Sequence, residues 1–550
     1  MPITELLKNN ARQNGDAAAV VELSPRSGSD RIVSPSDYDR SDSFPDLSAR
    51  REMTWRTMDR DADRIANFCI SLGLGKGKHV AVLMKNALEW FPIYFGIMRS
   101  GALVVPINFR NTTEETRQCL ELTRPEAIFF GPEYADQMAS ICEEGTSVKT
   151  FVSTSPDCPD FAVKYFDCVR GASGKHPNVP VSDEDDAAIY FTSGTTGQPK
   201  AILHTHSSIM SVCVTEQTHH GQKASDVFLC LAPLFHTGAM MHWLGSLVSC
   251  SKAVLLRDGK PRSILNALSE EGVTIAFMLV PWVQDILQEV ENGNLSFEDY
   301  NLDRWRLMHI GAQPVPPELI ARWREFFPEQ QYDTNYGLSE SMGPGCVHLG
   351  VENLRKVGAI GKPGINWQAK IVSNDGKDVP QGMIGELAVK GPGVMKLYYR
   401  DEESTASTLR GGWLYTGDMG YTDEEGFIYL VDRKKDVIIS GGENIFPIQI
   451  EDHIRTMGCV KDVAVIGGYD KRLLEVPVAV VSMKDGASAG ENDFAVHCEA
   501  LPRYKRPRRF IFADVPRNAT GKIEKPRLRA MYGGAPARDD VHGKTGKPTA

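Results

Sequence analysis

The pattern of hydrophobic and polar positions becomes regular after Thr54 and predicts a series of helices and strands. Apolar residues recur at helical spacing over Arg56–Leu72, and the apolar run at 79–84 is typical of a buried strand. A second helix is predicted over Glu89–Gly101, followed by a strand at 102–105. Because strands that alternate with helices are typical of layered α/β domains, we expect an α/β fold.

Later segments extend this pattern and then change it. A short buried strand at 187–191 leads directly into a loop of Gly, Ser and Thr, and further strands are predicted at 227–231, 253–256, 275–279 and 307–310. From 369 to 430 the strands are shorter and separated by Gly and Pro, as at Gly385–Lys390, which indicates a β-rich subdomain. After Lys435 the pattern restarts with apolar runs at 437–439, 448–454 and 463–466, which indicate a second, smaller α/β region.

Two segments lack any such pattern. Residues 24–52 are rich in Ser, Asp, Arg and Pro and are interpreted as a surface insertion or a flexible loop. Residues 531–550 consist largely of Gly, Pro, Asp and Lys, and we expect a disordered tail.

Composition narrows the class of protein. A chain of 550 residues exceeds one compact core and predicts two or more domains. The net charge of -10 argues against a nucleic acid partner, and no apolar run approaches the ~18 residues of a membrane span. The eleven cysteines lack CxxC pairs and zinc spacing, and the polar N-terminus lacks the apolar stretch of a signal peptide. We therefore expect a cytoplasmic protein without integral membrane contact.

The segment Tyr190–Lys200 carries the most chemical information. Its two glycines allow backbone N–H groups to turn inward, its hydroxyls add donors, and its lysine adds a positive charge, so that it suits a polyphosphate. These residues are Thr192, Ser193, Gly194, Thr195, Thr196, Gly197 and Lys200. The chain contains no Walker motif. Taken alone, the segment is also compatible with a polar surface turn.

Six motifs in order identify a family. The loop resembles the signature of the adenylate-forming superfamily, which includes acyl-CoA synthetases, luciferases and the adenylation domains of peptide synthetases. The other matching motifs are Gly311–Pro314, Asn335–Glu340, Tyr415–Asp418, Asp432–Asn444 and Pro516–Lys522. The resemblance spans roughly residues 50–530 and implies an N-terminal ATP- and acyl-binding domain at 1–432, a hinge at 433–436 and a mobile C-terminal lid domain at 437–530.

The resemblance assigns nucleotide roles. Tyr336 is expected to stack on adenine, Asp418 to accept bonds from the ribose hydroxyls, and Arg433 to reach the ribose or phosphate. Glu340, together with Thr195, is expected to bind the Mg²⁺ that bridges the phosphates. The remaining residues of the expected ATP/AMP site, besides the loop above, are Gly311, Ala312, Gln313, Asn335, Gly337 and Ser339.

The resemblance also implies domain alternation. Lys522 is expected to offset charge at the α-phosphate, and its Thr-Gly-Lys context near the C-terminus matches the family. Lys435 occupies the family's hinge position. After rotation, the segment Ser440, Gly441, Gly442 and Glu443 is expected to meet coenzyme A, where glycines permit close approach.

The segment Pro233–Trp243 constrains the identity of the carboxylic acid substrate. His236 stands at the family's carboxylate end and is expected to take part in catalysis. The segment contains no Asp or Glu, so an amino acid substrate is not expected. The expected acyl pocket comprises His236, Gly238, Met241, His242, Met278 and Trp282. Its apolar wall favours a neutral aromatic, alicyclic or medium-chain acid.

We therefore predict a Mg²⁺-dependent ligase that joins an acid to AMP, releases pyrophosphate, and transfers the acyl group to coenzyme A, acting as a monomer or homodimer. Two alternatives remain at this point. One is a ligase that loads a carrier-protein thiol. The other is a non-catalytic nucleotide or acyl sensor, against which the presence of Glu340, Asp418 and Lys522 argues.

Overall fold

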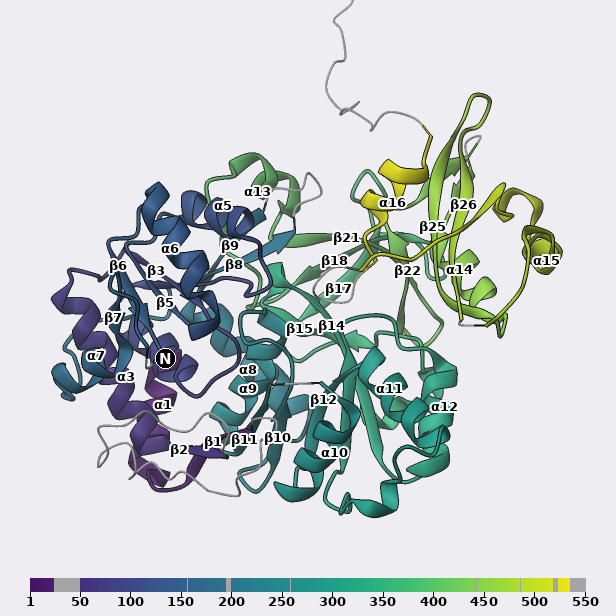
Figure 1. Cartoon of the computed structure of the whole chain (residues 1–550). Coiled ribbons are helices and arrows are strands. Elements are labelled where there is room, and N and C mark those ends of the chain that lie inside the picture. The colour runs from purple at the N-terminus through teal and green to yellow at the C-terminus, as the bar shows by residue number, and fades with distance from the viewer. Residues whose placement is uncertain are drawn as a thin grey trace, which may run out of the picture. The chain divides into compact units, whose positions relative to one another are not determined.

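A computed structural model describes most of the chain and divides it into two compact units (Figure 1). The described residues are 1–23, 50–155, 157–193, 199–257, 259–440, 443–484, 486–517 and 523–534, without the side chains of Ser193, Met241, His242 and Pro344. The large unit comprises Met1–Lys370, Ala388–Thr416 and Glu425–Ile428. The small unit comprises Ile371–Leu387, Gly417–Glu424 and Tyr429–Ala550. The expected boundary at 432 and hinge at 433–436 stay predictions.

The large unit contains a nine-stranded sheet with the order β16-β15-β14-β13-β12-β10-β11-β1-β2. The strands from β13 to β1 are parallel neighbours, as expected of strands connected through helices. The strands are β1 (Ala18–Leu23), β2 (Arg51–Thr54), β10 (Val227–Cys230), β11 (Lys252–Leu256), β12 (Ile275–Leu279), β13 (Leu307–Gly311), β14 (Gln331–Leu338), β15 (Gly343–Leu349) and β16 (Lys362–Pro363).

A second sheet of the large unit has eight strands in the order β19-β9-β8-β4-β3-β5-β6-β7. Its central strands are fully buried and consist mainly of Val, Leu, Ile, Ala and Phe, the composition of strands covered on both faces. The strands are β3 (His79–Leu83), β4 (Leu103–Pro106), β5 (Ala127–Phe130), β6 (Thr150–Ser153), β7 (Val163–Lys164), β8 (Asp186–Ser193), β9 (Pro199–Thr205) and β19 (Leu397–Tyr398).

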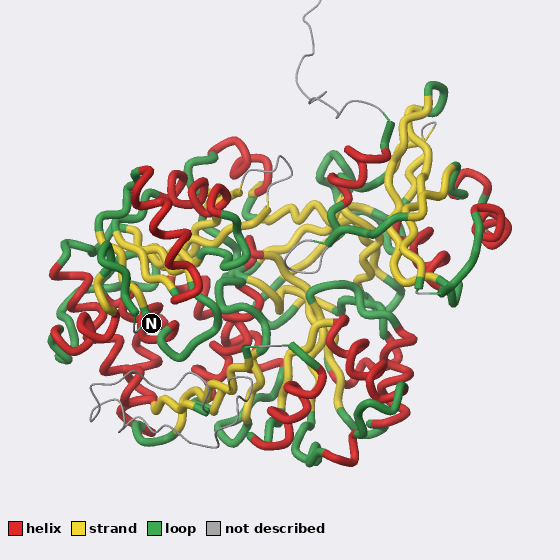
Figure 2. Tube along the Cα trace, in the orientation of Figure 1, coloured by secondary structure: helices red, strands yellow, loops and turns green. Residues whose placement is uncertain are grey.

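Helices lie against both sheets, as the red segments of Figure 2 show. The helix α3 carries its apolar residues on one buried face, and its N-cap is Thr54, whose hydroxyl accepts the N–H of Thr57. The α-helices of the large unit are α1 (Ile3–Asn14), α3 (Trp55–Ser71), α4 (Trp90–Arg99), α5 (Thr113–Thr123), α6 (Ala135–Glu144), α7 (Tyr165–Gly171), α8 (His206–His219), α9 (Thr237–Ser249), α10 (Pro261–Glu270), α11 (Val280–Glu291), α12 (Pro317–Phe326) and α13 (Glu402–Thr408). Its 3₁₀ turns are η1 (Pro132–Tyr134), η2 (Phe297–Asp299), η3 (Ser339–Ser341) and η4 (Val351–Lys356).

A five-stranded sheet with the order β17-β18-β21-β20, with β22 on β21, confirms the expected β-rich subdomain. Its strands are β17 (Gln368–Val372), β18 (Gly385–Lys390), β20 (Leu409–Arg410), β21 (Trp413–Thr422) and β22 (Ile428–Arg433).

The small unit has its own sheet in the order β24-β23-β26-β25, with β27 on β26. Isoleucines of α14 pack with valines of β25 and β26 into a separate apolar core, which explains why the apolar pattern restarts after Lys435. Its elements are β23 (Ile438–Ser440), β24 (Glu443–Ile445), α14 (Pro447–Arg455), β25 (Val460–Asp470), β26 (Leu474–Met483), α15 (Glu491–His497), η5 (Cys498–Ala500), η6 (Arg503–Lys505), β27 (Arg509–Phe512) and α16 (Lys525–Tyr532).

The α/β class and the predicted elements are confirmed, with two corrections. Met531 and Tyr532, which were expected in the disordered tail at 531–550, form the end of α16, and residues 535–550 lie outside the described part. Residues 24–49 lie outside the described part, but 51 and 52, which were predicted to belong to a surface loop, form the start of β2. Arg51 is fully buried because it pairs with Glu22 on β1 and with Glu89, 2.6 Å away. Ion pairing therefore buries a segment whose composition predicts exposure. Within the described residues, no helix combines the length and the apolar character that crossing a membrane requires.

Candidate functional site

The expected phosphate loop connects two paired strands. β8 and β9 run antiparallel, with Thr192 opposite Lys200. The loop residues Gly194, Thr195, Thr196 and Gly197 and the side chain of Ser193 lie outside the described part. Lys200, at the far side of the loop, donates from Nζ to Ser404 Oγ at 2.7 Å, and its Nζ lies 4.9 Å from the ring centroid of Tyr398.

Glu340 lies in the 3₁₀ turn η3, directly after β14. Ser341 Oγ accepts the N–H of Leu338 at 2.9 Å, and Met342 ends the turn in the left-handed region with φ 63°. The carbonyl of Glu340 accepts the N–H of Met395 at 2.7 Å. His204 Nε2 lies 2.8 Å from the carbonyl oxygen of Ser339, which ties the turn to β9. The Glu340 backbone is thus held from both sides.

Tyr398 links Glu340 to Lys200. It lies on β19, which pairs with β9, and its hydroxyl donates to Glu340 Oε1 at 2.7 Å. Burial, and then the negative charge of Glu340, raise the pKa of the Tyr398 phenol, so it stays a donor. The expected end of the phosphate loop and the expected magnesium ligand therefore contact one common side chain. Sequence reasoning missed Tyr398, because its strand has only two residues and no motif of its own.

Two further expected nucleotide segments lie at the ends of neighbouring strands. β13 ends at Gly311, and Ala312 follows with φ 67°, a strained conformation for a residue with a side chain. On β14, Tyr336 is 9% exposed, and the Asn335 amide donates to both carboxylate oxygens of Glu216 at 3.0 Å. Burial raises the Glu216 pKa to about 7, although Asn335 acts in the opposite direction. The side chain of Asn335 is therefore oriented by a buried glutamate of α8.

The expected acyl residues come from α9, β12 and α11. His236 caps α9, and its Nδ1 accepts the N–H of Gly238 at 3.2 Å, so the ring carries its proton on Nε2. Met278 is fully buried on β12. Trp282 approaches Gly259 so closely that a Cβ there would lie 2.6 Å from its Nε1. The side chains of Met241 and His242 lie outside the described part.

In the small unit, Asp418 and Arg433 form an ion pair, with Arg433 Nε 2.5 Å from Asp418 Oδ1. Asp418 is 4% exposed, whereas the Arg433 side chain is 40% exposed. The turn before Asp418 is braced by Glu386, which accepts the Gly417 N–H at 3.1 Å and pairs with Lys434 at 2.9 Å. The structure thus brings together two side chains that were both expected to meet the ribose.

The remaining small-unit residues lie at strand ends. Lys435 follows Arg433 in the turn after β22, and Ser440 faces Glu443 across β23 and β24. Gly441 and Gly442 between them lie outside the described part, as do residues 518–522 with Lys522. Arg517 and Ile523, which flank that segment, form an antiparallel bridge.

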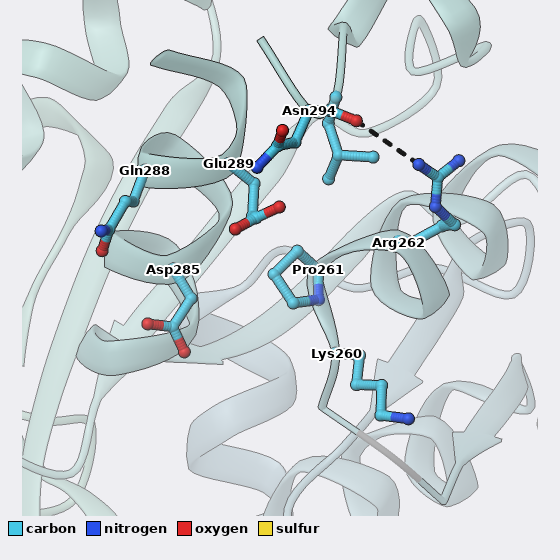
Figure 3. A pocket seen from close by; sticks show the side chains of 8 residues that line it. Lys260, Pro261, Arg262, Asp285, Gln288, Glu289 and Asn294 are labelled. Carbon is cyan, nitrogen blue, oxygen red and sulfur yellow. Dashed lines mark hydrogen bonds between the residues drawn. The ribbon is translucent and has the colours of Figure 1, made fainter. Parts of the chain in front are cut away.

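One surface hollow, of about 430 Å³, lies between α10 and α11 (Figure 3). It is lined by the charged and polar side chains of Lys260, Arg262, Asp285, Gln288, Glu289 and Asn294, with Pro261 and Leu295. None of the expected site residues lines it, so it takes no part in the site.

Comparisons with known proteins place this geometry in context. Residues 7–399 match the family described as AMP-binding enzyme, and residues 449–522 match its C-terminal domain. The chain is 31% identical over 497 residues to the long-chain-fatty-acid–CoA ligase FadD13 of Mycobacterium tuberculosis, covering 90% of this chain and 96% of that protein. It is 32% identical over 478 residues to the 2-succinylbenzoate–CoA ligase of Bacillus cytotoxicus, covering 85% and 92%. The o-succinylbenzoate CoA synthetase MenE of Bacillus subtilis, solved with ATP and magnesium, is similar with a TM-score of 0.79 and 25% identity, covering 96% and 99%.

Proposed function

The chain belongs to the AMP-binding enzyme family, and from that premise we propose that it is an ATP-dependent, AMP-forming carboxylic acid:CoA ligase. In the first half-reaction, the acid's carboxylate attacks the α-phosphate of ATP, giving acyl-AMP and pyrophosphate. In the second, the thiol of coenzyme A attacks the acyl carbonyl, giving the thioester and AMP.

One observation carries this assignment: the chain matches CoA ligases at 31–32% identity over 85–90% of its length. The two relatives act on different acids, a long-chain fatty acid and 2-succinylbenzoate, yet both form CoA thioesters. The reaction class is therefore common to the relatives, while the acid differs between them.

The residues around Glu340 fit a magnesium–nucleotide complex. The Tyr398 hydroxyl donates to Oε1 of Glu340 without neutralising the carboxylate, so the carboxylate can still bind a cation. Mg²⁺ prefers oxygen ligands of this kind. When bound, Mg²⁺ would neutralise phosphate charge, and we propose Glu340 and Thr195 as its protein ligands. We propose that Lys200, which contacts Ser404 and Tyr398, binds the phosphates. Thr192, Gly311–Gln313, Asn335–Gly337 and Ser339 complete the proposed nucleotide site.

The Asp418–Arg433 pair supports a ribose role. Arg433 contacts Asp418 through a short ion pair, and a carboxylate accepts bonds from two hydroxyls at once. Lys522 is proposed for the α-phosphate, Lys435 for the hinge, and Ser440–Glu443 for coenzyme A. These three roles rest on the motifs of the sequence.

For the acid, we propose a neutral aromatic, alicyclic or medium-chain carboxylic acid. Around His236, the side chains of Leu234, Ala239 and Met240 are at most 1% exposed and all apolar. The segment Pro233–Trp243 contains no carboxylate that would pair a substrate ammonium. A Cβ at the position of Gly238 would contact only the ring of His236, so the space beside this glycine is otherwise open.

We propose a cytoplasmic location and a monomeric or dimeric state. All eleven cysteines are free thiols in the structure, and most are buried, which fits a reducing compartment.

The test is a panel of acids incubated with ATP, Mg²⁺ and coenzyme A, with AMP, ADP, pyrophosphate and acyl-CoA measured separately. We expect AMP and pyrophosphate in equal amounts and acyl-CoA only when coenzyme A is present. Glu340→Gln is the matched variant, with weaker use of Mg²⁺·ATP. Stoichiometric ADP would contradict the proposal. Acyl transfer to a carrier protein but not to coenzyme A would favour the carrier-loading alternative, and nucleotide binding without turnover of any acid would favour the sensor.

A further inference from the structure

Four side chains from four elements of the large unit converge at a buried point that the proposed reaction does not use. His309 lies on β13, Asp333 on β14 and His348 on β15, while His220 caps the C-terminus of α8. One nitrogen or carboxylate oxygen from each lies within 4.8 Å of the others. All four residues are at most 5% exposed.

Strand register explains how they meet. His309 and Asp333 are direct partners across the parallel strands β13 and β14. Across β14 and β15, His348 is the partner of Asn335. Because residues two apart on a strand point to the same face, Asp333 and Asn335 share one face, and so do their partners. The end of α8 packs on that face and adds His220.

Asp333 lies at the centre of the cluster. Its Oδ1 is 2.5 Å from His309 Nδ1, and its Oδ2 is 3.5 Å from His348 Nε2 and 3.9 Å from His220 Nε2. Two ligands of one tetrahedral zinc ion, each about 2.0–2.2 Å from the metal, are about 3.3–3.6 Å apart. The two Oδ2 separations are long for hydrogen bonds and lie within a few tenths of an ångström of this range, whereas other donor atoms of the cluster, up to 4.8 Å apart, would move closer on binding an ion.

We propose that His220, His309, Asp333 and His348 bind one divalent transition-metal ion of the zinc type. Three imidazoles and one carboxylate supply the nitrogen and oxygen donors that zinc-type ions bind. Mg²⁺ and Ca²⁺, by contrast, prefer oxygen donors alone. A second buried carboxylate, Glu216, has its Oε2 3.4 Å from His220 Nε2. A dication balances the charges of both carboxylates at a point that water does not reach.

The site is structural, because four protein ligands enclose it and leave no position for a substrate. It connects α8 to three adjacent strands, and two of these strands lead into Gly311–Gln313 and Asn335–Glu340. His219 stacks on His348 with ring centroids 4.1 Å apart and planes at 10°, which orients a proposed ligand from outside the cluster. Metal binding here would stiffen the scaffold of the nucleotide loops.

The experiment uses tag-free full-length protein, since an oligohistidine tag binds zinc itself. The protein is stripped with a chelator, incubated with Zn²⁺, desalted and analysed for metal. We expect about one zinc per chain and a thermal unfolding temperature that rises with zinc concentration. Replacing Zn²⁺ by Co²⁺ should give the intense visible d–d absorption of a four-coordinate site.

Two variants locate the ion. Asp333→Asn and His348→Gln should each weaken metal affinity by roughly 10–100-fold or more. His176→Gln is the control, since His176 binds Asp63 away from the cluster, and it should retain wild-type stoichiometry. The proposal is overturned if wild-type protein retains no zinc, if both variants retain it as His176→Gln does, or if the Co²⁺ spectrum of the wild type is octahedral and weak. The spectrum needs no variant, so it decides the matter even if both variants fail to fold.

Discussion

The Tyr398 hydroxyl donates to Glu340 Oε1 at 2.7 Å, while the ring of the same residue lies 4.9 Å from Lys200 Nζ. A charge-assisted hydrogen bond of this kind fixes the rotamer of a carboxylate that would otherwise turn freely. We therefore propose Tyr398 as a positioning residue that acts through Glu340 and Lys200.

At this scale we predict that Tyr398→Phe removes the bond to Glu340 and keeps the ring beside Lys200. A hydrogen bond to a charged group contributes about 1.5–3 kcal/mol, so kcat/KM for Mg²⁺·ATP should fall on the order of tenfold or more, mostly at limiting magnesium. Steady-state kinetics across magnesium concentrations measure this.

The matched control is Tyr399→Phe. The Tyr399 ring packs against His79 at 5.3 Å, and its loss of a hydroxyl should leave magnesium dependence unchanged. Equal kinetics for the two variants would argue against the positioning role. So would a Tyr398→Phe substitution that lowers kcat/KM by the same factor in a Glu340→Ala background as in the wild type.

At the scale of elements, α16 is attached to the rest of the small unit by buried ion pairs. Lys525, in its first turn, is 9% exposed and lies 2.8 Å from Glu451 on α14. Although burial favours the neutral amine, Glu451 and Asp432 raise the pKa of Lys525 above its usual value. Arg529 pairs with Asp436 at 2.8 Å. The same helix begins three residues after Lys522, so these pairs fix the helix that follows the proposed catalytic segment in the chain.

We predict that Lys525→Met destabilises the small unit by about 3 kcal/mol, because it removes the nearest cation of the buried Glu451 and leaves only Arg455, 3.6 Å away. It should also slow acyl-AMP formation, since the segment before α16 loses its anchor. Thermal unfolding and single-turnover adenylation are the measurements.

Arg527→Met on the same helix is the control, because the Arg527 side chain is 65% exposed and pairs only loosely with Glu524 at 3.4 Å. Lys525→Arg should restore part of the rate. Comparable losses in the two methionine variants would show that the buried pair is not the cause.

Asp432 gives an element-scale prediction of pH dependence. Burial raises the pKa of this half-buried carboxyl to about 6, although Lys525 and the N–H groups of Ile448 and Arg433 oppose the shift. Between the unfolded pKa of about 3.9 and about 6, the folded state binds more protons than the unfolded state. The stability that Asp432 contributes is therefore complete below about pH 4 and is lost as pH rises through about 6.

Asp432→Asn should remove this loss. The free energy of unfolding of the variant minus that of the wild type should therefore be larger at pH 7 than at pH 4, by on the order of 2 kcal/mol. Denaturant unfolding of wild type and variant over that range is the measurement. Because other carboxyls titrate equally in both proteins, the difference between the two curves isolates Asp432. Parallel curves would contradict the shift.

At the scale of the whole molecule, the two half-reactions should separate by mutation. Lys522→Ala should slow acyl-AMP formation on the order of 10²–10³ or more, by analogy with oxyanion donors, yet still convert supplied acyl-AMP to acyl-CoA. Gly442→Leu should do the reverse and accumulate acyl-AMP, because a side chain would block the pantetheine. Lys435→Pro should also favour adenylation, since proline narrows the backbone angles of the hinge.

Rapid quench of each half-reaction, run separately, measures these effects. If Lys522→Ala and Gly442→Leu slow both half-reactions equally, domain alternation does not operate in this protein.

Hydrophobic periodicity and local motifs were sufficient to predict much of the molecule. The strands at 275–279 and 385–390 have the predicted bounds, and α3 and α4 begin within one residue of prediction. Such features are readable because each depends on neighbours within a few positions of the chain. The order of the six motifs likewise predicted the family, since the chemistry of each motif resides in adjacent residues.

Only the tertiary structure placed residues that are distant in sequence beside one another. His309, Asp333 and His348 follow no metal-binding spacing, and they meet because three strands pair in one register and leave their side chains on one face. Tyr398 reaches Glu340 because a two-residue strand pairs with β9. Strand order and register depend on crossover connections and on packing of whole elements, and no local pattern in the sequence encodes which residues will become neighbours.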